Sequence, residues 1–169
     1  VHHSVVACFY APSDLCGASG MYRERIRSNP NWHGSYARYD TVFVETDAER
    51  EGMLGMSIGG VFLFFSFTFQ DITHSCALVH WLSLPSETPD RDTSMWVVTL
   101  ETHTHGPRNR RVKTLAIIPL DSIAHAAHLL PIYSSALLPE DFHFSYSLDV
   151  FQAFYINKYV DHQTFEFLL

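Results

Sequence analysis

The basic side chains are concentrated in two short segments, and their type and spacing suggest contact with phosphate groups. Eight of the 11 Lys and Arg residues fall in these segments. The first carries Arg23, Arg25, Arg27 and Arg38, and the second carries Arg108, Arg110, Arg111 and Lys113. Arginine neutralises phosphates, and aromatic rings such as Trp32, Tyr36 and Tyr39 beside the first segment can stack on bases. These eight residues are the candidate nucleic-acid-binding residues. The alternative is a solvated surface that Glu24 partly neutralises.

The overall charge limits how such contacts can be used. The sequence has 18 Asp and Glu residues and a formal net charge of -7 with neutral histidines. This charge repels a polyanion at long range, so a strongly basic domain that binds nucleic acid over its whole surface is excluded. We expect nucleic-acid contact to be weak and tolerant of sequence.

The 11 histidines suggest a metal site, but their spacing does not support one. His125 and His128 are three positions apart, so on a helix both could face one ion. A zinc site needs three or four ligands in a fixed geometry, and neither an HExxH nor a CxxC motif occurs in the sequence. We expect no metal ion and no cofactor, and histidines that are solvated or hydrogen-bonded.

Paired acidic residues define the catalytic alternative. Asp90 and Asp92 form one pair, and Glu140 and Asp141 form another. A nuclease needs two or three carboxylates that converge on divalent ions. The sequence shows no rigid element that would bring these pairs together, so we predict no catalytic residue.

Length and composition point to a folded protein. The 169 residues are 47% apolar, 14% aromatic and only 17% charged, which excludes a wholly disordered chain. Cysteines at positions 8, 16 and 76 are sparse and odd in number, so they predict an intracellular location rather than a disulfide framework; the nucleus is a candidate compartment. The longest apolar run, residues 61–69, is far shorter than the ~20 residues of a membrane-spanning helix, so we expect a soluble protein without membrane contact.

The start of the sequence suggests a fragment of a longer protein. It begins at Val1, without a charged segment followed by an apolar one, so no secretory signal is expected. Residues 1–39 are predicted to form an N-terminal arm or loop region, because glycine and proline interrupt every regular pattern there. Residues 40–169 are predicted to form a β-barrel module with a C-terminal helix. Runs of β-branched and aromatic residues predict its strands at 41–44, 60–68, 75–84, 95–101 and 113–120.

Two segments change to the spacing of a helix. Residues 121–129 predict a short helix, and residues 147–157 predict an amphipathic C-terminal helix. We therefore expect an α+β fold that is mainly β, namely a small antiparallel, partly open β-barrel of the SH3/BAH-like kind with these two helices.

Alternation in the most apolar strand predicts the core. Side chains two apart share one face of a strand. The predicted core face consists of Val61, Leu63, Phe65 and Phe67, with Trp81 and Trp96 packed nearby.

An ordered set of segments resembles one protein family. The segments are residues 9–14 (FYAPSD), 21–27 (MYRERIR), 76–81 (CALVHW), 95–98 (MWVV), 120–123 (LDSI), 127–133 (AHLLPIY) and 154–162 (FYINKYVDH). Together they resemble the C-terminal region of proteins encoded by fungal DNA transposons, especially the Plavaka-type elements of basidiomycetes, which are related to the CACTA class. The resemblance covers most of the chain and lapses at residues 103–111. It implies a module at the end of a larger protein with an upstream catalytic DDE-type domain, and it assigns no catalytic residue here.

The order of elements is also similar to that of bromo-adjacent-homology (BAH) and SH3-like chromatin modules, by architecture alone. These observations favour a non-catalytic interaction module, a fragment or remnant of a transposon-encoded protein that mediates protein or nucleoprotein contacts. The alternative is a metal-dependent nucleic-acid-processing enzyme that uses Asp and His side chains. Three carboxylates converging in one pocket would favour the enzyme.

Overall fold

The computed structural model describes residues 1–11, 19–105, 110–133, 137–138 and 140–168, and it consists mainly of antiparallel β-structure. This confirms the expected mainly-β fold class. The strands are β1 (Ser4–Tyr10), β2 (Met21–Trp32), β3 (Tyr36–Tyr39), β4 (Thr41–Glu45), β5 (Met56–Phe69), β6 (Ile72–Ser83), β7 (Val97–Leu100), β8 (Thr102–His105), β9 (Arg110–Lys113), β10 (Leu115–Pro119), β11 (Ile123–Ala127), β12 (Leu129–Pro131) and β13 (Ala153–Ile156). Short helical segments are η1 (Gly52–Gly55), η2 (Leu120–Ser122), η3 (Phe144–Tyr146), α1 (Ser147–Val150) and α2 (His162–Phe167).

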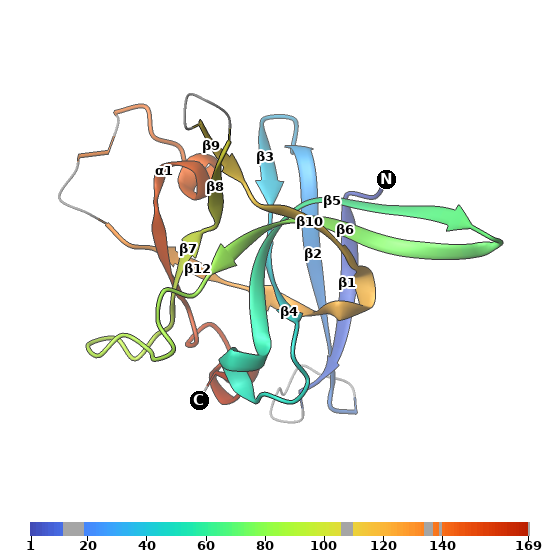
Figure 1. Cartoon of the computed structure of the whole chain (residues 1–169), viewed down its shortest axis with the longest axis horizontal. Coiled ribbons are helices and arrows are strands. Elements are labelled where there is room, and N and C mark those ends of the chain that lie inside the picture. Colours follow the sequence, from blue (N-terminus) through green and yellow to red (C-terminus); the bar gives the residue numbers. More distant parts are fainter. Residues whose placement is uncertain (12–18, 106–109, 134–136, 139, 169) are drawn as a thin grey trace.

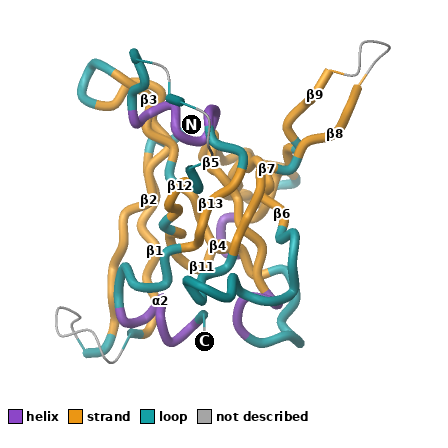
Figure 2. Tube along the Cα trace, turned by 90° about the vertical axis from the view of Figure 1, so that its left-hand side faces the viewer, coloured by secondary structure: helices purple, strands orange, loops and turns teal. Residues whose placement is uncertain are grey.

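The strands form one large sheet, one small sheet and a separate hairpin (Figure 1). The large sheet has the order β11-β4-β5-β6-β7-β13-β12, with β10 also paired to β6, and the small sheet has the order β1-β2-β3. The hairpin of β8 and β9 projects from the body (Figure 2). The end strands of the large sheet, β11 and β12, are separated in sequence by His128 alone. Among the described strands no closed barrel is detected.

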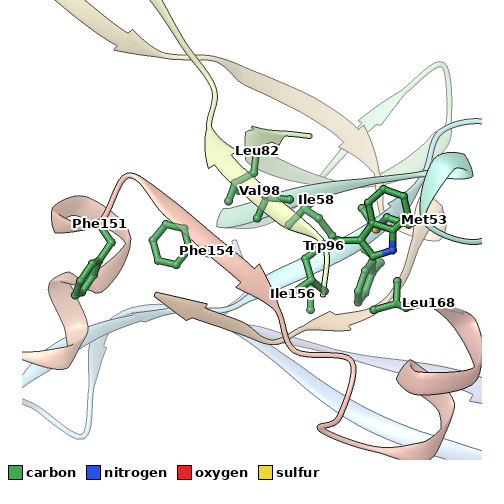
Figure 3. Close-up of a cluster of buried hydrophobic side chains, with 11 residues drawn as sticks. Met53, Ile58, Leu82, Trp96, Val98, Phe151, Phe154, Ile156 and Leu168 are labelled. Carbon is green, nitrogen blue, oxygen red and sulfur yellow. The ribbon is translucent and has the colours of Figure 1, made fainter. Parts of the chain in front are cut away.

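Strand β4 separates two hydrophobic clusters, because both of its faces are buried. Phe43 belongs to one cluster, and Val42 and Val44 on the opposite face belong to the other. The first cluster consists of Phe43, Met53, Ile58, Leu82, Trp96, Val98, Ala127, Phe151, Phe154, Ile156 and Leu168 (Figure 3). The second consists of Ile26, Val42, Val44, Val61, Phe64, Ala77, Val79, Ile118 and Ala126. Through Ile26, the small sheet contributes to the core of the large one.

The N-terminal residues are more regular than expected. The prediction of an irregular segment is wrong for local structure, because most of the described part of residues 1–39 lies in β1, β2 and β3. Alternation along β2 explains this: Ile26 and Ser28 are buried, whereas Arg23 and Arg25 are exposed. Charges at every second position are typical of a strand with one solvated face. The division of the chain at residue 40 into arm and module stays a prediction.

Both predicted helices are largely wrong. Residues 121–129 form the end of η2 and then β11 and the start of β12, and the segment 147–157 is helical only in α1 before it continues into β13. A spacing of three and four residues is compatible with a helix, but backbone pairing of Ala126 with Val42 and of Phe154 with Val98 makes these segments strands. Such tertiary pairing overrides local propensity. In the described ranges no helix has the length and apolar character needed to cross a membrane.

A β-bulge changes which side chains of β5 enter the core. The pairing register of β5 and β6 shifts between Val61 and Leu63, and one extra residue transfers the following side chains to the opposite face. Val61 is buried as predicted, but Phe64 takes the next core position, while Phe65 is only partly buried and Phe67 is exposed. The predicted core face is therefore correct for Val61 and wrong beyond it. Trp96 is buried and Trp81 packs against the second cluster.

Candidate functional site

Strand β2 aligns three of the predicted arginines along one groove. Arg23, Arg25 and Arg27 occupy alternate positions, so their side chains leave the strand on the same face. Together with Arg38 of β3 they line a cavity of about 460 Å³ whose other side includes residues 126–129. We call this cavity the arginine groove. Four of the eight predicted cationic residues therefore share one surface.

An aromatic ring contacts two of these guanidinium groups, and a carboxylate pairs with one of them. Arg27 and Arg38 lie over the ring of Trp32, with their Cζ atoms 5.1 and 5.3 Å from its centroid. Arg38 Nε donates to Asp40 Oδ1 at 2.9 Å, and the backbone N–H of Arg27 donates to Asp40 Oδ2 at 2.8 Å. Cation–π contacts and the ion pair fix the side chains while leaving other guanidinium donors for a ligand.

Glu24 is the second carboxylate of the groove, and it has a structural contact. Its Oε2 accepts the backbone N–H of Ala126 at 2.8 Å, and its Oε1 lies 4.0 Å from Nε2 of His128. Glu24 thereby joins β2 to β11. Four arginines and two acidic residues, Glu24 and Asp40, line this groove, so its lining has more basic than acidic residues although the chain as a whole is acidic.

A second cavity of about 350 Å³ adjoins the arginine groove. Four aromatic side chains line it, and we call it the aromatic cleft: Tyr36, Tyr39, Phe62 and Phe144. The rings of Tyr39 and Phe62 are 5.6 Å apart at 80°, and those of Tyr36 and Phe144 are 5.0 Å apart at 82°. Both pairs are edge-to-face, an arrangement that aromatic rings favour.

An ion pair lies at the rim of the aromatic cleft. Lys113 Nζ of β9 is 2.9 Å from Asp149 Oδ1 of α1, and both side chains are largely accessible. The same ammonium group lies 5.0 Å from the centroid of Phe62. Because Lys113 is the last residue of β9, the second predicted cluster reaches the same region of the molecule as Arg38.

His80 lies at the base of the cleft and is uncharged at neutral pH. It is only 3% exposed, and burial lowers its pKa below the ordinary value. Its Nε2 lies 2.8 Å from the carbonyl oxygen of Glu101, so the neutral tautomer that carries the proton on Nε2 donates to this carbonyl. The ring of Phe62 is parallel to it at 6.2 Å.

The remaining cations of the second segment are Arg108, Arg110 and Arg111, of which Arg111 lines neither cavity. Arg111 is exposed on the β8–β9 hairpin. Arg110 begins β9 and pairs through its backbone with His105. Arg108 lies outside the described residues. Of the eight predicted residues, the structure brings Arg23, Arg25, Arg27, Arg38 and Lys113 together around two adjoining cavities.

Sequence reasoning missed Phe62, Phe144, His80 and Asp149. Phe62 stands at the bulge, where alternation no longer tells which face a side chain takes. Phe144 lies in a short helical turn without a periodic signal, and Asp149 lies in the predicted C-terminal helix, whose spacing does not indicate a partner in β9. His80 was placed correctly on a strand, but its burial depends on partners from other strands. Residues of β3, β5, β9 and α1 come together in this cleft, and a local sequence pattern does not predict such long-range packing.

His125, His128 and Asp90, which the sequence singled out, each have a local contact in the structure. Within the described ranges, no group of three or more His, Cys, Asp or Glu side chains could hold a metal ion. His125 is buried, its pKa is lowered by that burial, and its Nδ1 lies 2.9 Å from the carbonyl oxygen of Ala126. His128, expected beside it on a helix, is instead half exposed next to Glu24. Asp90 accepts from the backbone N–H and hydroxyl of Thr93, and these hydrogen bonds lower its pKa.

Comparison with protein-family models, with curated proteins and with solved structures finds no match to this chain. The function therefore has to be argued from the two cavities.

Proposed function

We propose that this chain is a non-catalytic interaction module whose arginine groove binds an extended polyanion, the sugar-phosphate backbone of a nucleic acid, in a nucleoprotein complex. One observation carries the proposal. Four arginines from two strands line a single groove in a chain whose formal net charge is -7. A positive groove on an acidic protein attracts phosphates locally and repels them elsewhere. Binding is therefore confined to the groove and is weak.

The wider setting is a further part of the proposal. We place the module in a protein encoded by a fungal DNA transposon of the Plavaka type, with the catalytic domain upstream and an intracellular, nuclear site of action. Support comes from the ordered segments that resemble that family. A partly open barrel of the SH3/BAH-like kind belongs to the same proposal. In its support, the end strands β11 and β12 of the large sheet follow each other directly along the chain.

Salt dependence of binding tests the role of the groove. Each phosphate neutralised releases counterions, so log affinity falls with log salt by about 0.9 per duplex phosphate and about 0.7 per single-strand phosphate. Arg23 and Arg25 are exposed. Replacing both (Arg23→Gln and Arg25→Gln) should flatten the slope by about 1.4–1.8. The measurement is fluorescence anisotropy with labelled oligonucleotides between about 50 and 200 mM salt.

The matched control replaces two exposed arginines that do not line either cavity, Arg50→Gln and Arg91→Gln. It removes the same formal charge, so a general effect of net charge would change both slopes equally. A slope that is the same for groove and control variants contradicts the proposal.

The β8–β9 hairpin is the second predicted contact. Replacing Arg108, Arg110 and Arg111 with Ala should flatten the salt slope without unfolding the domain, because a hairpin tip lies outside the core. An unchanged slope would confine phosphate contact to the arginine groove.

A further inference from the structure

The aromatic cleft continues the arginine groove. Arg38, Tyr39, Ser147 and Leu148 line both cavities. Arginines two apart on β2 are separated by about 7 Å along the strand, which is comparable to the spacing of successive phosphates in an extended single strand. A ligand strand that is bound along these arginines and continues past Arg38 therefore reaches the aromatic cleft.

The walls of the cleft suit a planar ring. Tyr39 with Phe62 and Tyr36 with Phe144 form two corners, each of which combines the face of one ring with the edge of another. A planar heterocycle can stack on a face and contact the neighbouring edge. Hydroxyl groups of Ser145 and Ser147 also line the cleft and can hydrogen-bond to polar atoms at the edge of such a ring.

The charge of the cleft favours an anionic ligand over a cationic one. Aromatic pockets with a carboxylate also bind methylated ammonium groups. Here, however, the carboxylate of Asp149 is paired with Lys113, whose ammonium group already lies over Phe62. Arg38 adds a second cation to the lining. Asp40, the partner of Arg38, does not line the cleft, so the lining has two cations against one carboxylate. An aromatic ring attached to a phosphate fits this lining better than an ammonium ion does.

We propose that the aromatic cleft receives one unpaired nucleobase, so that the ligand of the arginine groove is a single-stranded nucleic acid; this inference rests on the proposed function. In a duplex each base is stacked and paired and would have to leave the helix at an energetic cost before entering a cleft. Stacking on aromatic side chains is open to every base, so binding is tolerant of sequence. The module therefore binds single strands more tightly than duplexes of equal length.

The experiment compares three labelled ligands: a single strand of thymidines, a strand of the same length whose central sites are abasic, and a duplex. Loss of one stacking contact corresponds to about 5- to 150-fold in affinity. We expect the wild-type protein to bind the thymidine strand more tightly than the abasic strand by a factor in this range. Phe144→Ala, which changes a residue of the aromatic cleft that does not line the arginine groove, should abolish this difference and leave the affinity for the abasic strand unchanged.

A matched control separates stacking from a general effect of removing an aromatic ring. Phe69 is 61% exposed and Phe144 is 60% exposed, but Phe69 lies at the end of β5 and lines neither cavity. Phe69→Ala should retain the full preference for the thymidine strand. Photochemical cross-linking of a strand containing 5-iodouracil should in addition label Tyr36, Tyr39 or Phe144.

The outcomes distinguish the two proposals. Equal affinity for thymidine and abasic strands, with the salt slope still dependent on Arg23 and Arg25, overturns the base-binding cleft and leaves the polyanion groove standing. Absence of salt-dependent binding to all three ligands overturns the groove itself. Cleft occupation by a trimethyllysine peptide, observed as a Phe144-dependent affinity, would also overturn the nucleobase assignment.

Discussion

The base and the tip of the β5–β6 ribbon are built from the same kinds of residues but lie in different surroundings. At the base, Val61, Phe64 and Val79 are buried, whereas at the tip Phe69 and Ile72 are about 60% exposed. The base is covered by the small sheet (Figure 1), and the backbone of His2 forms a bridge to Phe64 of β5. Beyond it the ribbon extends away from the body. Apolar residues on paired strands are thus buried only where a second layer covers them.

The largest expected effect separates a buried from an exposed phenylalanine of this ribbon. Phe64→Ala should lower the free energy of unfolding by about 3–5 kcal/mol, because it removes a ring that is 1% exposed and leaves a cavity. Phe67→Ala should cost less than ~1 kcal/mol, since Phe67 is 49% exposed. Denaturant titration of both variants measures this difference. Similar losses for the two would show that the tip is covered in solution.

A smaller effect, dependent on pH, should come from His80, which lies on β6 at the base of the ribbon. Burial lowers the pKa of His80 in the folded state, with a further lowering by Lys113 and opposing contributions from Glu101 and Asp149. Below the ordinary pKa of about 6.5 the unfolded chain takes up a proton that folded His80 resists. Its contribution to stability is therefore fully present above this pH and decreases as the pH falls.

The slope from one histidine is at most about 1.4 kcal/mol per pH unit. His80→Gln, which can still donate a hydrogen bond to Glu101, should reduce the loss of stability between about pH 7.5 and 5.5. The test is to measure the free energy of unfolding of both proteins across this pH range. An identical pH dependence for His80→Gln and the parent would contradict the contribution assigned to His80. Buried His125 contributes with the same sign.

The smallest effect concerns the turn at the end of the ribbon. Gln70 and Asp71 have φ of 50° and 61°, a left-handed conformation in which most side chains are strained. Two such residues between paired Phe69 and Ile72 correspond to a type I′ turn, for which Asn-Gly is preferred. Gln70→Asn with Asp71→Gly should stabilise the protein by less than ~1 kcal/mol, as is usual for substitutions at an exposed site.

The gain in stability should be confined to the region of the turn. Amide hydrogen exchange of Thr68 and Thr73, which flank the turn, should become slower, whereas exchange of Val79 at the base should not change. Gln70→Ala keeps the strain and serves as the control. Faster exchange at the tip of the Asn-Gly variant would contradict the assigned turn.

How well each strand could be predicted from the sequence depends on whether its structure requires distant partners. Continuous β-branched and aromatic runs correctly predicted β4 and the long β5–β6 ribbon, because such runs depend little on distant partners. The segments that became β11 and β13 have apolar residues at helical spacing, and only pairing with β4 and β7 makes them strands. The bulge after Val61 could not be predicted either, since a single extra residue leaves no signal in the composition of the strand.

The candidate site was predictable in its charges and not in its shape. Clustered cations are easily recognised in an acidic sequence, so the arginines of β2 and Lys113 could be selected as candidates, and their role stays a prediction. Their meeting across one surface depends on how β3, β9 and α1 pack, which local spacing does not encode. The aromatic cleft was missed for this reason.

The pairing of β4 with β11 has a consequence for synthesis on the ribosome. Thr41 hydrogen-bonds to the carbonyl of Ala127 across 86 residues of sequence. At about 5–20 residues per second, the nascent chain must wait roughly 4–17 s before this edge of β4 can be covered. During that time Val42 and Val44 belong to a strand with an open hydrogen-bonding edge, which can pair with other chains. Folding is therefore completed late, and cellular yield depends on how well this edge is protected in the meantime.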